Sequence, residues 1–202
     1  MKTIMISIAL LIFASGIYSQ QTPVKKDGSK RKQYPHFSIT PNGGAIFPLP
    51  KVLSSSFKPG GMFGLDLSYR LNKEVALFLN GSYAFMSSKT TGAPVGSYII
   101  GNVGPRYYFT HKNLKSALFF EASVGAYNFR QNSYSIQDTA GTTTTIDQIS
   151  NTKAGISGGI GGSLALSKEM DILVKSDYHV VFTPNGSSSF ISVMGGLEFR
   201  FR

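Results

Sequence analysis

The chain ends in the stretch FISVMGGLEFRFR, residues 190–202, and this stretch decides the fold. Successive side chains of a β-strand point to opposite faces of the sheet, so alternate residues form two files. The apolar file consists of Ile191, Val193, Gly195, Leu197, Phe199 and Phe201. The other file consists of Ser192, Met194, Gly196, Glu198, Arg200 and Arg202. The pattern predicts a strand with one apolar face and one charged face.

The same alternation recurs upstream in stretches that are separated by turn residues. The expected strands cover residues 36–47, 62–71, 75–85, 99–109, 118–127, 156–166, 171–182 and 190–202. A tilted strand crosses a bilayer with about 9–11 residues, which suits these lengths. The sequence therefore predicts an all-β fold, an eight-stranded antiparallel up-and-down transmembrane β-barrel with a polar interior.

The connections between the expected strands alternate in length. Short turns follow the second, fourth and sixth strands, at residues 72–73, 110–115 and 168–169. Longer loops are expected at residues 48–59, 87–96, 131–152 and 183–189. Outer-membrane barrels have short periplasmic turns and longer extracellular loops, so both chain ends are expected on the periplasmic side.

The charged file determines which face meets lipid. A Lys or Arg on the lipid face costs about 2–4 kcal/mol at the bilayer midplane, whereas inside the barrel acids and bases can pair. The expected interior polar network consists of Asp66, Arg70, Arg106, Glu121, Lys175, Asp177, His179, Glu198 and Arg200. The alternative, a soluble barrel with an apolar interior, would expose a broad apolar band to water, which a monomer does not tolerate.

Three local features add expectations. Pro105 removes a backbone donor from the fourth strand, and we expect a β-bulge there. The inward glycines of the sixth strand, Gly159 and Gly161, leave space for a large neighbour such as Phe119 or Tyr127. Aromatic residues near strand ends predict interfacial girdles. The girdle residues are Tyr69, Tyr107, Phe109, Phe199 and Phe201 at one end, and Tyr83, Phe85, Tyr127, Phe129 and Phe182 at the other.

Composition and the N-terminus agree with this interpretation. Residues 1–19 have a charged start and an apolar centre, the layout of a signal peptide cleaved after Ser19, with a retained anchor helix as the alternative. Residues 20–35 are expected to form a flexible basic periplasmic lead, and residues 36–202 the barrel domain. The net charge is +10, and the chain has no cysteine. The basic run in the lead lacks a recognition helix or stacking motif, which argues against nucleic-acid binding.

The chain resembles the eight-stranded outer-membrane barrels of the OmpA membrane-domain and OmpX type, of the sort abundant in Bacteroidetes. The resemblance covers about residues 36–202 and is based on the loop pattern, the run GPRYYF at residues 104–109 and the ending GLEFRFR. It implies an outer-membrane location and contact with outer-membrane lipid and lipopolysaccharide. The family usually ends on an aromatic residue that the barrel-assembly machinery recognises, so Phe199 and Phe201 are the expected assembly signal. A monomer is expected.

Function follows less directly from these residues. An eight-stranded barrel is filled by its own side chains, so at most a narrow small-solute channel is expected. A lipid A-modifying enzyme is the catalytic alternative, with His36 and Ser38, or His179 beside Asp177, as candidate residues. No cofactor is expected, since the Gly-rich run at residues 158–162 lies within a strand and no helix follows it. We expect a non-catalytic structural or surface-interaction role, carried by the longer loops.

Overall fold

Strand formation follows the two-residue alternation along most of the chain. The computed structural model describes residues 35–49, 53–110, 116–137, 143–184 and 186–201. The expected signal peptide at residues 1–19 and nearly all of the lead at residues 20–35 lie outside these ranges. No helix within the described ranges is long and apolar enough to span a membrane.

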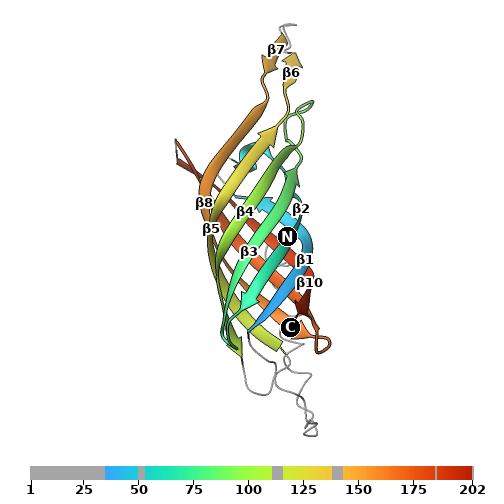
Figure 1. Cartoon of the computed structure of the whole chain (residues 1–202). Coiled ribbons are helices and arrows are strands. Elements are labelled where there is room, and N and C mark those ends of the chain that lie inside the picture. Colours follow the sequence, from blue (N-terminus) through green and yellow to red (C-terminus); the bar gives the residue numbers. More distant parts are fainter. Residues whose placement is uncertain (1–34, 50–52, 111–115, 138–142, 185, 202) are drawn as a thin grey trace, which may run out of the picture. The chain divides into compact units, whose positions relative to one another are not determined.

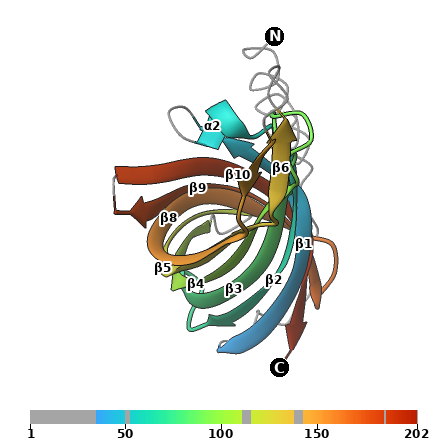
Figure 2. The same cartoon turned by 90° about the horizontal axis from the view of Figure 1, so that it is seen from above.

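Eight long strands form a closed barrel in the order β1-β10-β9-β8-β5-β4-β3-β2 (Figure 1). Their bounds are β1 (His36–Pro48), β2 (Gly60–Arg70), β3 (Val75–Met86), β4 (Gly96–Thr110), β5 (Ser116–Gln131), β8 (Ile149–Ala165), β9 (Met170–Thr183) and β10 (Gly186–Phe201). All neighbours are antiparallel, and β1 closes the barrel on β10, with Phe37 opposite Phe201. The strands enclose a common interior (Figure 2). The predicted eight-stranded up-and-down barrel is confirmed.

Three short elements lie in the connections. The helix α2 (Leu53–Ser56) follows β1, and the strands β6 (Tyr134–Gln137) and β7 (Thr143–Ile146) pair as a separate two-stranded sheet between β5 and β8. The β6–β7 hairpin extends beyond the barrel from the ends of β5 and β8 (Figure 1). We call this end of the barrel the loop end, and the end with the β2–β3, β4–β5 and β8–β9 connections the turn end.

The predictions of two long loops were wrong. Most of the loop expected at residues 131–152 is strand, because β5 runs to Gln131, β8 starts at Ile149 and β6 and β7 pair between them. Most of the loop expected at residues 183–189 is also strand, because β9 runs to Thr183, β10 begins at Gly186 and these two residues pair. Gly186 has a φ of 139°, a conformation that glycine adopts without strain. Backbone pairing continues here although the alternation of apolar and polar side chains has ended.

The predicted bulge at Pro105 is also wrong. On either side of the proline, Val103 pairs with Val124 and Arg106 pairs with Glu121, so the same number of residues separates the pairs on both strands. The pairing of β4 with β5 is interrupted across Pro105, while its pairing with Leu77 of β3 continues. The missing donor therefore breaks one ladder locally without changing the register.

Burial follows the predicted faces. In β3, exposed and buried positions alternate from Ala76 to Met86. Large apolar side chains such as Leu79, Val124 and Ile160 lie on the outside, at 51%, 59% and 71% exposure. The inside carries the polar side chains of the barrel, and Arg106 there has an exposure of 0%. The expected polar interior is confirmed.

The girdle prediction is wrong for Tyr127 and Phe129. Tyr127 is fully buried, and Phe129 packs against the apolar cluster at the loop end of the interior. Above Ala126 the outward residues of β5 are Asn128 and Arg130. The polarity of the two faces of this strand is therefore reversed near the loop end, and its aromatic residues turn inward.

The expected fit of a large aromatic residue against an inward glycine is confirmed for Gly161 and Phe119, whereas Gly159 lies against Asp177 and Tyr127 lies against Gly155. A Cβ added to Gly161 would collide with the ring of Phe119 and the carbonyl of Val174, and one added to Gly155 would collide with the ring of Tyr127. Glycines of β8 thus provide space for large side chains from β5, which is the adjacent strand.

We predict that Gly161→Val destabilises the barrel by about 1–3 kcal/mol, because the added methyl groups overpack the interior against Phe119. Urea unfolding in lipid vesicles measures this change. Gly101→Ala is the matched control, since a Cβ there would meet no atom within 4 Å. Equal stability of the two variants would contradict the proposed packing.

Candidate functional site: the polar interior

The centre of the interior holds an ion cluster from four strands: Asp66 on β2, Arg106 on β4, Glu121 on β5 and Lys175 on β9. Arg106 Nη2 lies 2.6 Å from Glu121 Oε2 and 3.1 Å from Asp66 Oδ2. Lys175 Nζ lies 3.0 Å from Asp66 Oδ2 and 3.0 Å from Glu121 Oε1. Each cation therefore bridges the same two carboxylates. The cluster joins strands from opposite sides of the barrel.

Neighbouring polar groups and rings hold the cluster in place. Asn80 Nδ2 donates to Asp66 Oδ1 at 2.5 Å, and Asp177 Oδ2 lies 3.6 Å from Lys175 Nζ. The Arg106 guanidinium lies 4.6 Å from the ring centre of Phe119, in cation–π range. Because its carboxylates and cations are buried together, the cluster is stable only while each charge keeps its partners.

Two arginines lie toward the turn end of the interior. Arg200 Nη2 donates to Asp171 Oδ1 at 2.6 Å and to the carbonyl of Ser167 at 3.1 Å. Arg70 Nη2 donates to the carbonyl of Lys73 in the β2–β3 turn at 2.7 Å. Both side chains thus tie the interior to the turns at this end.

The first catalytic candidate, the pair His36 and Ser38, lies in the same region. Both residues are buried, at 6% and 1% exposure. Ser38 Oγ donates to Glu198 Oε1 at 2.7 Å and shares a hydrogen bond of 2.6 Å with Ser68 Oγ. The structure therefore places the Ser38 hydroxyl within the interior hydrogen-bond network.

The second catalytic candidate, His179, lies between the ion cluster and the loop end. Its Nε2 is 3.1 Å from Ser192 Oγ, and its Nδ1 is 3.1 Å from the Tyr127 hydroxyl. The imidazole stacks on Phe190 with 4.5 Å between ring centres. A serine beside a histidine is the geometry of an activated nucleophile. However, Ser192 is 0% exposed and His179 is 3% exposed, so this triad of contacts is part of the packed interior.

Apolar side chains fill the loop end of the interior. This mouth cluster consists of Ile46, Leu53, Phe57, Met62, Ala84, Met86, Tyr98, Ile100, Tyr127, Val181, Phe190 and Met194. Leu53 and Phe57 come from the connection that contains α2. A backbone bridge between Phe57 and Ser88 joins this connection to the β3–β4 loop. The mouth cluster therefore includes residues of a loop as well as residues of the barrel wall.

Several interior residues were not among the predicted site residues. Asp171 pairs with Arg200. It lies in the same alternating file of β9 as Lys175 and Asp177, so the alternation along this strand was enough to predict that Asp171 faces the interior. The roles of Tyr127 and Ser192 depend on which strands lie opposite each other, and the local pattern does not give that. Among the described residues, no group of three or more His, Asp or Glu side chains is placed to hold a metal ion.

Comparison with known proteins gives a result for structure only, because no family model and no curated protein matches the sequence. The barrel is similar to Neisserial surface protein A, with a TM-score of 0.62 and 12% identity over 82% of this chain and 97% of that chain. It is also similar to the N-terminal β-barrel domain of Pseudomonas aeruginosa OprF, with a TM-score of 0.54 and 14% identity over 82% and 97% of the two chains.

A third similar structure is Ail, the attachment invasion locus protein of Yersinia pestis, with a TM-score of 0.53 and 15% identity over 84% and 100% of the two chains. The chain has the fold of the eight-stranded outer-membrane barrels. Identities this low establish the fold alone. The barrel domain spans nearly the full length of each of these structures.

We predict that Lys175→Met lowers the free energy of unfolding by about 3–5 kcal/mol, because it leaves buried carboxylates without one of their cations. Urea titration in lipid vesicles, followed by heat-dependent gel mobility, measures the loss. Lys73→Met is the control, since the Lys73 side chain is 67% exposed and lies 3.3 Å from Glu74. The control should change stability by at most about 1 kcal/mol. A Lys175 variant as stable as the control would show that the cluster does not hold the strands together.

Proposed function

We propose that this protein is an integral outer-membrane β-barrel that spans the bilayer as a monomer and presents its loop end at the cell surface for binding. One observation carries the proposal: the outward positions of the strands form an apolar belt around a charged interior. Leu77, Val103 and Leu118 on this belt have exposures of 50%, 52% and 50%. Each such side chain would cost about 25 cal/mol per Å² of apolar area in water, and lipid removes that cost.

The proposed route to the outer membrane uses both ends of the chain. A signal peptide at residues 1–19 would direct export, and Phe199 and Phe201 would be recognised by the barrel-assembly machinery. Both phenylalanines point outward at the end of β10, with exposures of 37% and 51%, where a membrane-side partner can reach them. The belt would then contact outer-membrane lipid and lipopolysaccharide.

The interior geometry favours neither catalysis nor transport. The residues that could form a nucleophile and base, Ser192 and His179, are buried in the packed interior. The mouth cluster occupies the loop end of the interior, and the ion cluster crosses its centre. We therefore propose that the barrel is a scaffold rather than a lipid A-modifying enzyme or a channel.

The loop end supplies the surface for this role. Binding residues commonly lie on loops that a rigid scaffold holds in place. Here the scaffold presents the β6–β7 hairpin, and it presents the α2 connection bridged to the β3–β4 loop. The similar structure from Yersinia pestis is named an attachment invasion locus protein, which supports attachment as the role.

We predict that replacing residues 132–148 with a two-residue turn abolishes attachment while the barrel remains intact. Bacterial cells that carry the full chain should bind a monolayer of cultured epithelial cells. Cells that carry the shortened chain should bind only as well as cells without the protein. Counting bound cells measures the effect, and heat-dependent gel mobility of both chains shows that each barrel is folded.

Two single-cysteine variants control for orientation in this experiment, since the natural chain has no cysteine. A membrane-impermeant maleimide should label Thr144→Cys, in β7, on intact cells. It should label Lys168→Cys, in the β8–β9 turn, only after lysis. Attachment that persists with the shortened chain would overturn the proposed binding role, and the reverse labelling pattern would overturn the orientation.

A further inference from the structure

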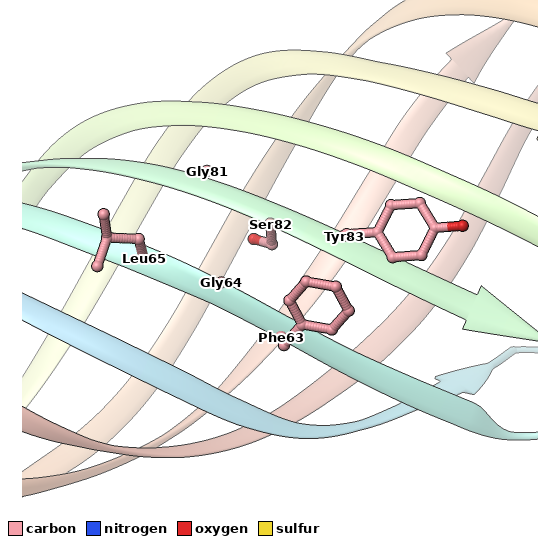
Figure 3. Close-up of a pocket in the computed structure, with 6 residues that line it drawn as sticks. All are labelled: Phe63, Gly64, Leu65, Gly81, Ser82 and Tyr83. Carbon is pink, nitrogen blue, oxygen red and sulfur yellow. The ribbon is translucent and has the colours of Figure 1, made fainter.

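The outer face of the barrel has a hollow between β2 and β3. It has a volume of about 390 Å³, and its sides are formed by Phe63, Leu65 and Tyr83 (Figure 3). Gly81 lies at its base, where a Cβ would meet no atom within 4 Å. The rings of Phe63 and Tyr83 lie 5.5 Å apart and close one side of the hollow. The hollow is apolar and faces away from the interior.

From this hollow a row of small outward residues continues across the next strands. Gly81 pairs with Gly101 on β4, Gly101 pairs with Ala126 on β5, and Ala126 pairs with Ala154 on β8. Larger outward residues border this row, among them Leu79 on one side and Ile99 on the other, so the row is lower than its surroundings and we call it the groove. Neighbouring strands lie about 4.8 Å apart, so the groove from β3 to β8 is about 14 Å long.

A hydrogen-bonded polar group lies at the β5–β8 end of the groove. Arg130 Nε donates to Asn128 Oδ1 at 2.6 Å, and Asn128 Nδ2 donates to Thr152 Oγ1 at 2.8 Å. Asn128 is the next outward residue after Ala126 on β5, and Thr152 is the outward residue before Ala154 on β8. Both therefore adjoin the groove directly. Among the outward positions of the described barrel strands, Arg130 is the only Lys, Arg, Asp or Glu.

The tilt of the strands orients this arrangement. In Figure 1 the strands lean so that β5 and β8 continue upward to the β6–β7 hairpin. Tyr83 and Ile99 are in the same cross-strand row as Asn128 and Thr152. This row is aromatic or aliphatic on β3 and β4 but polar on β5 and β8. A change of this kind indicates that the row rises out of the apolar belt toward the loop end.

We propose that this surface binds a phosphorylated acyl lipid of the surrounding leaflet. Arg130, Asn128 and Thr152 would hold the phosphate, and the acyl chain would lie along the groove with its end in the hollow beside Phe63. A guanidinium forms strong, directional hydrogen bonds with phosphate, and only its Nε is engaged within the described residues. The inference rests on the proposed function, because the groove meets lipid only if the belt is inserted in a bilayer.

The two parts of the surface together select this ligand. An acyl chain alone would have no use for the guanidinium of Arg130. A soluble phosphate would have no use for an apolar groove that leads away from the charge. An amphiphile with an anionic head and a hydrocarbon chain satisfies both parts at once.

A tryptophan reporter tests the proposal, because the natural chain has no tryptophan. Phe63→Trp in the full-length chain is reconstituted in phosphatidylcholine vesicles that contain increasing amounts of a brominated-acyl lipid, which quenches tryptophan on contact. Brominated phosphatidylglycerol should reach half-quenching at a several-fold lower mole fraction than brominated phosphatidylcholine. Leu197→Trp, on the outward face of β10, should show no such preference.

Two charge variants separate a specific site from general attraction of anionic lipid. Arg130→Gln, made in the Phe63→Trp chain, should abolish the preference for phosphatidylglycerol. Lys153→Gln removes the same charge from the neighbouring strand β8 but from the inward file, and it should leave the preference intact. Gly81→Leu, which fills the base of the hollow, should weaken quenching of the Phe63→Trp reporter by both lipids.

The outcomes distinguish this proposal from the proposed function. Equal quenching of the Phe63→Trp reporter by both lipids, or equal effects of the Arg130 and Lys153 variants, would overturn the lipid site and leave the membrane-spanning barrel in place. Absence of quenching at both tryptophan positions by either lipid would overturn the membrane-spanning barrel itself.

Discussion

The two-residue period of the β-strand is the constraint on which the whole structure depends. A bilayer offers no water to backbone amides, so a sheet that crosses it must close and leave no edge. Closure of β1 on β10 meets this requirement. Once the barrel is closed, every side chain lies either outside or inside. Acids and bases then meet in a narrow interior, and the contacts of Arg106 and Lys175 with Asp66 and Glu121 follow from this sorting.

The sorting reverses near the loop end. Along most of β5 the outward residues are apolar, but Asn128 and Arg130 are polar, while Tyr127 and Phe129 pack inward. Where lipid covers the wall, the apolar side chains belong outside. Where water surrounds the wall, they form a conventional core inside, and here that core is the mouth cluster. The position of the reversal indicates the expected edge of the bilayer. The proposed lipid site lies at this edge, where the polar group of Arg130, Asn128 and Thr152 adjoins the small outward residues Ala126 and Ala154.

The sequence alone predicted the strands and their faces, because both follow from the local alternation of apolar and polar residues. It did not predict where strands continue beyond the bilayer. Residues 131–152 and 183–189 lack alternation, yet Tyr134–Gln137 pair with Thr143–Ile146, Ile149–Thr152 pair with β5, and Gly186–Ser189 pair with β9. The alternation along each strand predicted that the charged residues face the interior, but it did not predict which acid pairs with which base. Arg106 and Glu121 are cross-strand neighbours, whereas the contact of Asp66 with Lys175 spans the interior and depends on barrel closure.

The most direct test of whether apolar residues face lipid and charged residues face the interior is a spin-label accessibility scan along β10 in lipid vesicles, with one cysteine at a time from residues 190 to 201. Collisions with oxygen, which dissolves in lipid, should be frequent for labels at Val193, Leu197 and Phe199. Labels at Ser192, Met194 and Glu198 should be shielded from it. The oxygen profile should have a period of two along the strand. A profile without this period, or with maxima at Ser192 and Glu198, would contradict the allocation of apolar residues to lipid and charged residues to the interior.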